Sequence, residues 1–259
     1  MDRLAPALSL ALALLLPALA QAASPEERGL EIAKITDAAN TGFQGETSSM
    51  EMDLINAHGD KVTRKMSSQL LEVDGDGDRS VMTFVWPADV KGTRMLTWTH
   101  KSGTDDQWLY LPSLKRVKRI SSRNKAGAFM GSEFAYEDLG SQEIEKYSWK
   151  HVRDEVVGGR KTWVLERIPV DKKSGYSKQV LWMDQEWKSA ARIDYYDRKG
   201  ELLKTGTFHG YEKHGKYWRM SRIEMVNKQT RKRSIIRWSD RKLGAVDDAD
   251  AFDPENLED

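Results

Sequence analysis

Strand-like segments separated by short polar turns are the feature of this sequence that most restricts its fold. Met50, Met52 and Leu54 alternate with Glu51 and Asp53, which is the two-residue period of a strand with one buried face. Turn sequences recur at near-regular intervals, for example at residues 58–60, 158–159, 198–200 and 213–215. Because no helical pattern lies between these segments, we expect antiparallel pairing of about ten to eleven strands, in a sheet that must curl.

Two segments depart from this strand pattern. Residues 24–27, Ser-Pro-Glu-Glu, have the form of a capping box that starts a helix, with Ile32, Ile35 and Ala39 on its apolar face. Residues 121–140 contain three glycines and little periodicity, so we expect a long loop with one helical turn. The predicted fold is mainly β, with this helix and this central loop available to cover the sheet.

Several predicted strands are apolar on both faces. Met82, Phe84 and Trp86 share one face of a strand whose other face is also apolar, and Trp182 lies in a second strand of this kind. A sheet with two apolar faces needs a cover on each face. The helix can cover part of one face, and either more protein or an apolar ligand must cover the other.

The first 22 residues have the form of a cleavable secretory signal peptide. Arg3 precedes an uncharged apolar run over residues 4–19, and Ala20-Gln21-Ala22 matches a cleavage site. An uncleaved membrane anchor is the alternative, but the run is slightly shorter than the ~20 residues that a span needs. We therefore expect cleavage near Ala22, export from the cytoplasm, and one domain over residues 23–259.

Charge and cysteine content narrow the possible functions. Lys and Arg total 41 against 40 Asp and Glu, so the composition gives no argument for nucleic acid binding. The absence of cysteine excludes disulfides, a cysteine nucleophile and a lipidated cysteine. The five histidines have no metal-site spacing, and no Gly-x-Ser-x-Gly motif occurs. We therefore predict no catalytic residues, no metal and no cofactor. We also expect the protein to be a monomer.

A partial calcium motif lies in one predicted turn. Asp74, Asp76 and Asp78 have the first spacings of a calcium-binding loop. Arg79 stands where that loop requires glycine, and Val85 stands where it requires glutamate. A solvated hairpin turn is the favoured interpretation.

Residues 131–139, Gly-Ser-Glu-Phe-Ala-Tyr-Glu-Asp-Leu, resemble the signature of the outer membrane lipoprotein-sorting protein family. That family is related to the periplasmic carrier LolA and its receptor LolB. Other parts of the chain resemble it too, namely residues 76–80, 108–112, 115–120, 180–184 and 195–197. The resemblance implies a curved antiparallel half-barrel closed by helices, whose apolar concave face holds acyl chains.

The apolar pattern and this resemblance together give a set of candidate lipid-binding residues. They are Phe84, Trp86, Trp98, Tyr110, Phe129, Met130, Phe134, Tyr136 and Trp182. The four in the central loop either plug the core or form a lid over the concave face, with Gly127 and Gly131 as hinges.

A basic run follows the first group of strands. Its candidate contact residues are Lys115, Arg116, Lys118 and Arg119, which could meet anionic lipid headgroups or an acidic partner surface. The alternative is a solvated edge strand, on which lysine deters aggregation.

We predict a non-enzymatic, soluble periplasmic carrier that binds the acyl chains of a lipid or lipoprotein for transfer to or from the outer membrane. The alternative is an adaptor that binds no lipid and docks on an inner-membrane lipid exporter of the resistance-nodulation class. A hydrolase is a third hypothesis, but no constellation of residues in the sequence supports it.

Overall fold

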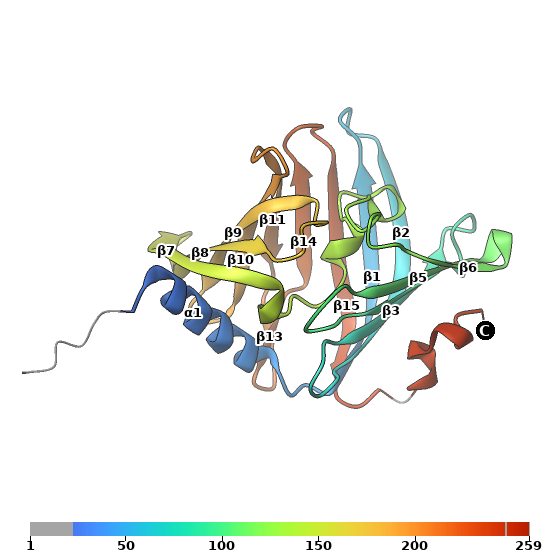
Figure 1. Cartoon of the computed structure of the whole chain (residues 1–259). Helices are drawn as coiled ribbons and strands as arrows, with labels where there is room; N and C mark the ends of the chain where they lie inside the picture. The colour runs from blue at the N-terminus through green and yellow to red at the C-terminus, as the bar shows by residue number, and fades with distance from the viewer. Residues whose placement is uncertain (1–22, 247, 259) are drawn as a thin grey trace, which may run out of the picture.

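The computed structural model describes residues 23–246 and 248–258. The predicted signal peptide, residues 1–22, lies outside the described residues. Within the described part of the chain, one α-helix precedes a long series of strands (Figure 1). No helix in that part is long and apolar enough to cross a membrane.

A 13-stranded antiparallel sheet forms the body of the molecule. Its strands are β1 (Gly45–Ile55), β2 (Lys61–Leu71), β3 (Arg79–Trp86), β4 (Arg94–Trp98), β5 (Asp106–Leu111), β6 (Arg116–Arg119), β7 (Tyr147–Val157), β8 (Arg160–Pro169), β9 (Tyr176–Asp184), β10 (Ser189–Asp197), β11 (Leu202–His209), β14 (Arg222–Asn227) and β15 (Arg233–Leu243). The spatial order is β6-β5-β4-β3-β2-β1-β15-β14-β11-β10-β9-β8-β7, and the sheet curves without closing into a barrel. A separate hairpin pairs β12 (Glu212–His214) with β13 (Tyr217–Arg219).

The predicted curved antiparallel sheet is confirmed, but the structure has more strands than predicted. The basic run pairs with β5 and becomes the edge strand β6. The chain between residues 217 and 227 divides between β13 and β14. The division arises because the chain leaves the sheet at Gly210, which has a left-handed φ of 63°, and returns at Ser221, whose backbone N–H donates to the His209 carbonyl.

Helix α1 (Pro25–Asn40) begins with the predicted capping box. The Glu27 backbone N–H donates to the Ser24 hydroxyl at 3.1 Å, and the Ser24 N–H donates to the Glu27 carboxylate at 2.8 Å. The buried face differs from the predicted one. Ile32 is fully buried as expected, but Ile35 is 37% exposed.

The close contact between α1 and β7 explains this difference. A Cβ added at Gly29 would come within 2.7 Å of backbone atoms of Lys150 and His151. The helix therefore lies on β7 through the side that carries Gly29, Ile32 and Ala33, because glycine alone permits that approach. Ile35 is rotated away from this side.

Two apolar clusters lie on opposite faces of the sheet. The larger cluster lies on the concave face and includes Phe84 and Leu165. The smaller cluster lies on the convex face of β3 to β5, where Phe252 and Leu257 from the C-terminal residues cover it. For these strands, protein covers the second apolar face.

Residues 120–146, here called the strap, connect β6 to β7. These strands form the two opposite edges of the sheet, so the strap must cross the concave side (Figure 1). The predicted long loop is present, with three short 3₁₀ turns in place of one helical turn. All the 3₁₀ turns of the described chain are η1 (Pro112–Leu114), η2 (Phe129–Gly131), η3 (Tyr136–Asp138), η4 (Ile144–Lys146), η5 (Asp250–Phe252) and η6 (Pro254–Asn256).

The substitution Gly29→Ala tests the helix contact. Glycine to alanine inside a helix normally stabilises it by about 1 kcal/mol. Here we expect destabilisation by about 1–3 kcal/mol, because the added methyl group must displace the β7 backbone. Urea unfolding monitored by circular dichroism measures the change. The control is Ala38→Gly on the exposed side of α1, which should cost only the propensity difference; a stabilised Gly29→Ala protein would show that the close contact is absent.

Candidate functional site

A buried ion pair fixes the strap to the middle of the concave face. Lys204 on β11 donates to the Asp138 carboxylate of the strap at 2.6 Å, and the two side chains are only 4% and 7% exposed. The same ammonium group donates to the Glu133 carbonyl at 2.8 Å, and the Tyr176 hydroxyl donates to Asp138 at 2.8 Å. Burial raises the pKa of Tyr176, and the negative charge of Asp138 adds to this shift, so Tyr176 remains a hydrogen-bond donor.

Other polar contacts extend this attachment along the strap. The Glu133 backbone N–H donates to the Ser234 hydroxyl at 3.0 Å, and Asn227 donates to the Glu133 carboxylate at 2.7 Å. The Glu137 carboxylate accepts from the Gly175 N–H at 2.8 Å and from the Ser174 hydroxyl at 2.7 Å. The motif from residue 131 to 139 therefore supplies acidic side chains that bind the sheet.

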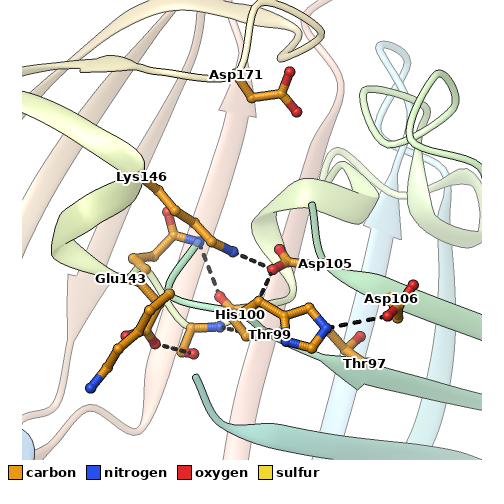
Figure 2. Close-up of polar contacts among 12 residues, drawn as sticks. Thr97, Thr99, His100, Asp105, Asp106, Glu143, Lys146 and Asp171 are labelled. Carbon is orange, nitrogen blue, oxygen red and sulfur yellow. Dashed lines mark hydrogen bonds and ion pairs between the residues drawn. The ribbon is translucent and has the colours of Figure 1, made fainter. Parts of the chain in front are cut away.

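The end of the strap attaches to the turn between β4 and β5 (Figure 2). The Ser141 N–H donates to the Thr99 hydroxyl at 3.1 Å, and the Ser141 hydroxyl donates to Glu143 at 2.7 Å. Lys146 forms an ion pair with Asp105, which also accepts from the His100 N–H. Together these contacts hold the strap against the sheet from Glu133 to Lys146.

The aromatic residues of the strap fill part of the concave face. Phe129 is 2% exposed and lies 5.9 Å from Phe84 and 5.8 Å from Tyr136, measured between ring centroids. Phe134 is also buried, and Met130 packs against the same cluster. The strap therefore plugs one part of the face and leaves space elsewhere.

Two apolar cavities remain between the sheet and its covers. The inner cavity, about 310 Å³, lies between the strap and the sheet, with walls that include Met50, Ile223 and Met225. The helix cavity, about 350 Å³, lies beneath α1, with walls that include Leu181 and Met183. Both cavities are lined by Ile193, Phe208, Met220, Gln142 and Arg167, so they adjoin.

A wider opening, here called the mouth, adjoins both cavities. It has a volume of about 1000 Å³ and shares Met220 and Gln142 with them. Its outer rim is acidic, because it includes Asp37, Asp78 and Glu143. Burial raises the pKa of all three carboxyl groups, for Asp78 to about 7 with a further contribution from Glu143.

Five of the candidate lipid-binding residues come together on the concave side: Phe84, Phe129, Met130, Phe134 and Tyr136. Of these five, Phe134 lines the inner cavity.

The other four candidates lie elsewhere. Trp98 and Tyr110 face the convex side, where Trp98 donates to the Phe252 carbonyl at 2.7 Å. Trp182 also faces that side and stacks on Arg192, with the guanidinium 4.5 Å from the ring centroid. Trp86 is 50% exposed because a β-bulge pairs it with Lys65 on the opposite face.

The basic run lies on the outer edge of the sheet. Lys115, Arg116 and Lys118 are exposed, and Arg119 is exposed but forms an ion pair with Asp106. This edge is remote in the sheet order from β7 to β11, which carry the walls of the helix cavity.

Sequence analysis missed two buried cations on the concave face, Lys204 and Arg167. A pattern in the sequence could have identified Arg167. Trp163 and Leu165 point inward from β8, and Arg167 continues the same two-residue alternation. A charged residue that continues an inward apolar series requires an explanation by function or by pairing.

The turn with Asp74, Asp76 and Asp78 is the hairpin between β2 and β3. Asp76 accepts from His100 at 2.8 Å and from the Lys101 N–H at 2.9 Å, and the His100 contact lowers the pKa of Asp76 to about 2. Within residues 23–246 and 248–258, no group of three or more His, Cys, Asp or Glu side chains is arranged to hold a metal ion.

The ion pair between Lys204 and Asp138 is tested by a double-mutant cycle. We expect Asp138→Asn and Lys204→Met each to lower the free energy of unfolding by about 3–5 kcal/mol, because each leaves a buried charge without its partner. The double variant should lose clearly less than the sum. Glu31→Gln, which breaks the exposed pair of Glu31 with Arg28, is the control and should cost below about 1 kcal/mol. Additive losses in urea unfolding would contradict this role for the pair.

The raised pKa of Asp78 predicts a pH dependence of stability. The folded protein binds this proton more tightly than the unfolded chain, so the free energy of unfolding falls as pH rises from about 4 to about 7. Asp78→Asn should make that slope shallower and stabilise the protein at pH about 8 by up to about 4 kcal/mol. Asp74→Asn, in the exposed part of the same turn, is the control. An unchanged slope in unfolding measured across this range would show that Asp78 has an ordinary pKa.

Comparisons with known proteins were made for the sequence and for the fold. A family model described as "Uncharacterized protein" matches residues 76–259. No curated protein matches the chain. Among solved structures, an outer membrane lipoprotein-sorting protein domain from Vibrio parahaemolyticus is 49% identical, with a TM-score of 0.88 over 90% of this chain and 100% of that chain.

Two further structures are similar. A DUF1329 family protein from Desulfovibrio piger is 30% identical, with a TM-score of 0.86 over 91% of this chain and 100% of that one. A LolA superfamily protein from Nitrosomonas europaea is 19% identical, with a TM-score of 0.69 over 87% of this chain and 97% of that one, and it supports the fold alone. By its 49% identity to the Vibrio domain, the chain belongs to the family of outer membrane lipoprotein-sorting protein domains, and it shares the fold of LolA superfamily proteins.

Proposed function

We propose that this protein is a periplasmic carrier that holds the acyl chain of a lipid or lipoprotein in the two adjoining cavities on its concave side. The observation that carries the proposal is the pair of apolar cavities between the sheet, the strap and α1. Membership of a lipoprotein-sorting family supports the same function. The proposed function is binding and release, with no catalytic step.

The size and lining of the cavities suit an acyl chain. Volumes of about 310 and 350 Å³ lie at the lower end of those that small-molecule sites have, about 300–1,000 Å³. Several wall residues are methionines, whose flexible side chains adapt to chains of different length and branching. Burial of a chain contributes about 0.8 kcal/mol per CH₂ group, so a chain of ~14 carbons has a large gross driving force.

The mouth offers the entry path. It adjoins both cavities at Met220, and it opens between the end of α1 and the turns at the ends of β2 and β4. An acyl chain that enters there reaches the cavities without displacement of Phe129 or Phe134 from the core. In this proposal the strap, which includes Met130 and Tyr136, is a fixed wall, and Phe84 of the sheet packs against its Phe129.

The basic edge supplies a candidate docking surface. We propose that Lys115, Arg116 and Lys118 approach anionic membrane headgroups or an acidic partner, with Arg119 held by Asp106. An inner-membrane lipid exporter is the candidate donor, and the predicted signal peptide supports a location on the periplasmic side. The carrier would work as a monomer.

Met220→Trp tests the cavities as the binding site. Met220 lines the mouth and both cavities, so a larger ring there should block the path and weaken uptake of dodecanol at least about tenfold. Titration calorimetry with the mature protein measures this affinity, and thermal unfolding checks the fold. Leu114→Trp, at the exposed basic edge, is the matched control and should bind as the wild type does. Equal binding by both variants would place the ligand elsewhere, and absence of binding by the wild type would favour the lipid-free adaptor.

A further inference from the structure

Arg167 is a buried cation that lines both apolar cavities. Its side chain extends from β8 on the concave face and the residue is 4% exposed. Its cross-strand neighbours are Trp149 on β7 and Gln179 on β9. The guanidinium lies 4.1 Å from the ring centroid of Tyr147 and 5.5 Å from that of Trp149.

The hydrogen-bond partners of Arg167 are neutral. Its Nε donates to the Gln179 side-chain carbonyl at 2.8 Å, and one terminal nitrogen donates to the Gln142 side-chain carbonyl at 2.9 Å. Among the residues that the structure describes, no carboxylate forms an ion pair with it. Arginine is rarely buried to this extent without a carboxylate, because loss of water from a charged group costs several kcal/mol.

Three other cations of the concave side have carboxylate partners, whereas Arg64 donates to the Met130 carbonyl of the strap. Lys204 pairs with Asp138, and Arg219 and Arg241 share the two oxygens of Glu46. Arg167 differs from these three cations because its side-chain hydrogen-bond partners are both neutral amides. A buried cation without a carboxylate partner suits a negatively charged ligand.

The rim of the mouth is acidic, whereas Arg167 at the cavities is a cation. Asp78 and Glu143 line the mouth and neither cavity, whereas Asp37 lines both the mouth and the helix cavity. The raised pKa of Asp78, about 7, reduces the negative charge that this residue carries near neutral pH. An anionic ligand is therefore favoured at Arg167 more than at the rim.

We propose that Arg167 binds the acidic group of the cargo, a carboxylate or a phosphate, while the acyl chain occupies the adjoining cavities. The inference rests on the proposed carrier function and specifies the chemical class of its ligand. A fork of guanidinium N–H donors matches the oxygens of either acidic group. The acidic group takes the acceptor position that the Gln142 carbonyl now fills, which is accessible because Gln142 lies at the surface and lines both cavities and the mouth.

A purely structural role for Arg167 predicts different behaviour. In that case the guanidinium only connects β8 to the strap through Gln142, and its loss weakens folding without changing which ligand is preferred. The preference for an acid over a matched alcohol therefore separates the two roles. It is a difference between two ligands of the same protein, so it does not depend on the stability of a variant.

The test is titration calorimetry of the mature protein with dodecanoic acid, monododecyl phosphate and dodecanol. For the wild type, we expect one or both acids to bind at least about tenfold more tightly than the alcohol, as for a charge-assisted hydrogen bond. Arg167→Met should remove this preference and leave alcohol binding unchanged. Arg167→Lys should retain part of it, which covers the case in which Arg167→Met does not fold. Arg192→Met, on the convex face, is the matched control and should keep the full preference.

Each outcome bears on the inference. Tighter binding of the phosphate indicates a phospholipid-type source, tighter binding of the carboxylate indicates a fatty-acid-type source, and both support a role for Arg167. Equal affinity of the wild type for acids and alcohol overturns the inference but leaves the carrier function intact. A preference that survives in Arg167→Met also overturns it. Failure of all three probes, the alcohol included, overturns the carrier function itself.

Discussion

The connection between the two edges of the sheet is the constraint on which the rest of the structure depends. β6 and β7 are consecutive in the chain but form opposite edges of the curved sheet, so residues 120–146 must cross its concave side. The strap covers apolar surface that would otherwise face water, and it brings acidic side chains to that surface. The buried pair of Asp138 with Lys204 fixes its position. The inner cavity exists because the strap is held by polar contacts above a face that its own side chains do not fill completely.

Much of the architecture could be predicted from the sequence because it depends on local patterns. Alternation of apolar residues identified most strands, and Ser24 with Glu27 identified the helix start. The predicted strand number was too low because the chain between residues 217 and 227 divides between two strands, and because the basic run, for which an edge strand was one of two interpretations, does pair with β5. The helix face was predicted wrongly, with Ile35 inward. The sequence pattern does not reveal how closely Gly29 lets α1 approach β7.

The candidate site was predicted only in part, for reasons that involve tertiary structure. Aromatic residues were chosen by type, but the side on which a strand residue lies depends on its register. Trp98 and Tyr110 lie on the face covered by the C-terminal residues, and the bulge in β3 turns Trp86 outward. The alternation of Trp163 and Leu165 marks Arg167 as an inward residue, but the partners that enclose it come from the strap and from neighbouring strands, which a local pattern does not contain. Aromatic residues of the strap thus build part of the cover, whereas aliphatic residues and methionine outnumber aromatic residues in the walls of the inner cavity.

The central claim is that the concave side carries an apolar ligand with an acidic group. The most direct measurement is native mass spectrometry of the mature protein, purified from the periplasm without detergent, followed by lipid extraction and identification of what is released. The account predicts one non-covalently bound amphiphile per chain, with an acyl chain and a carboxylate or phosphate, that dissociates on unfolding. A ligand-free mass, together with no uptake of added dodecanoic acid or dodecanol, would contradict the account.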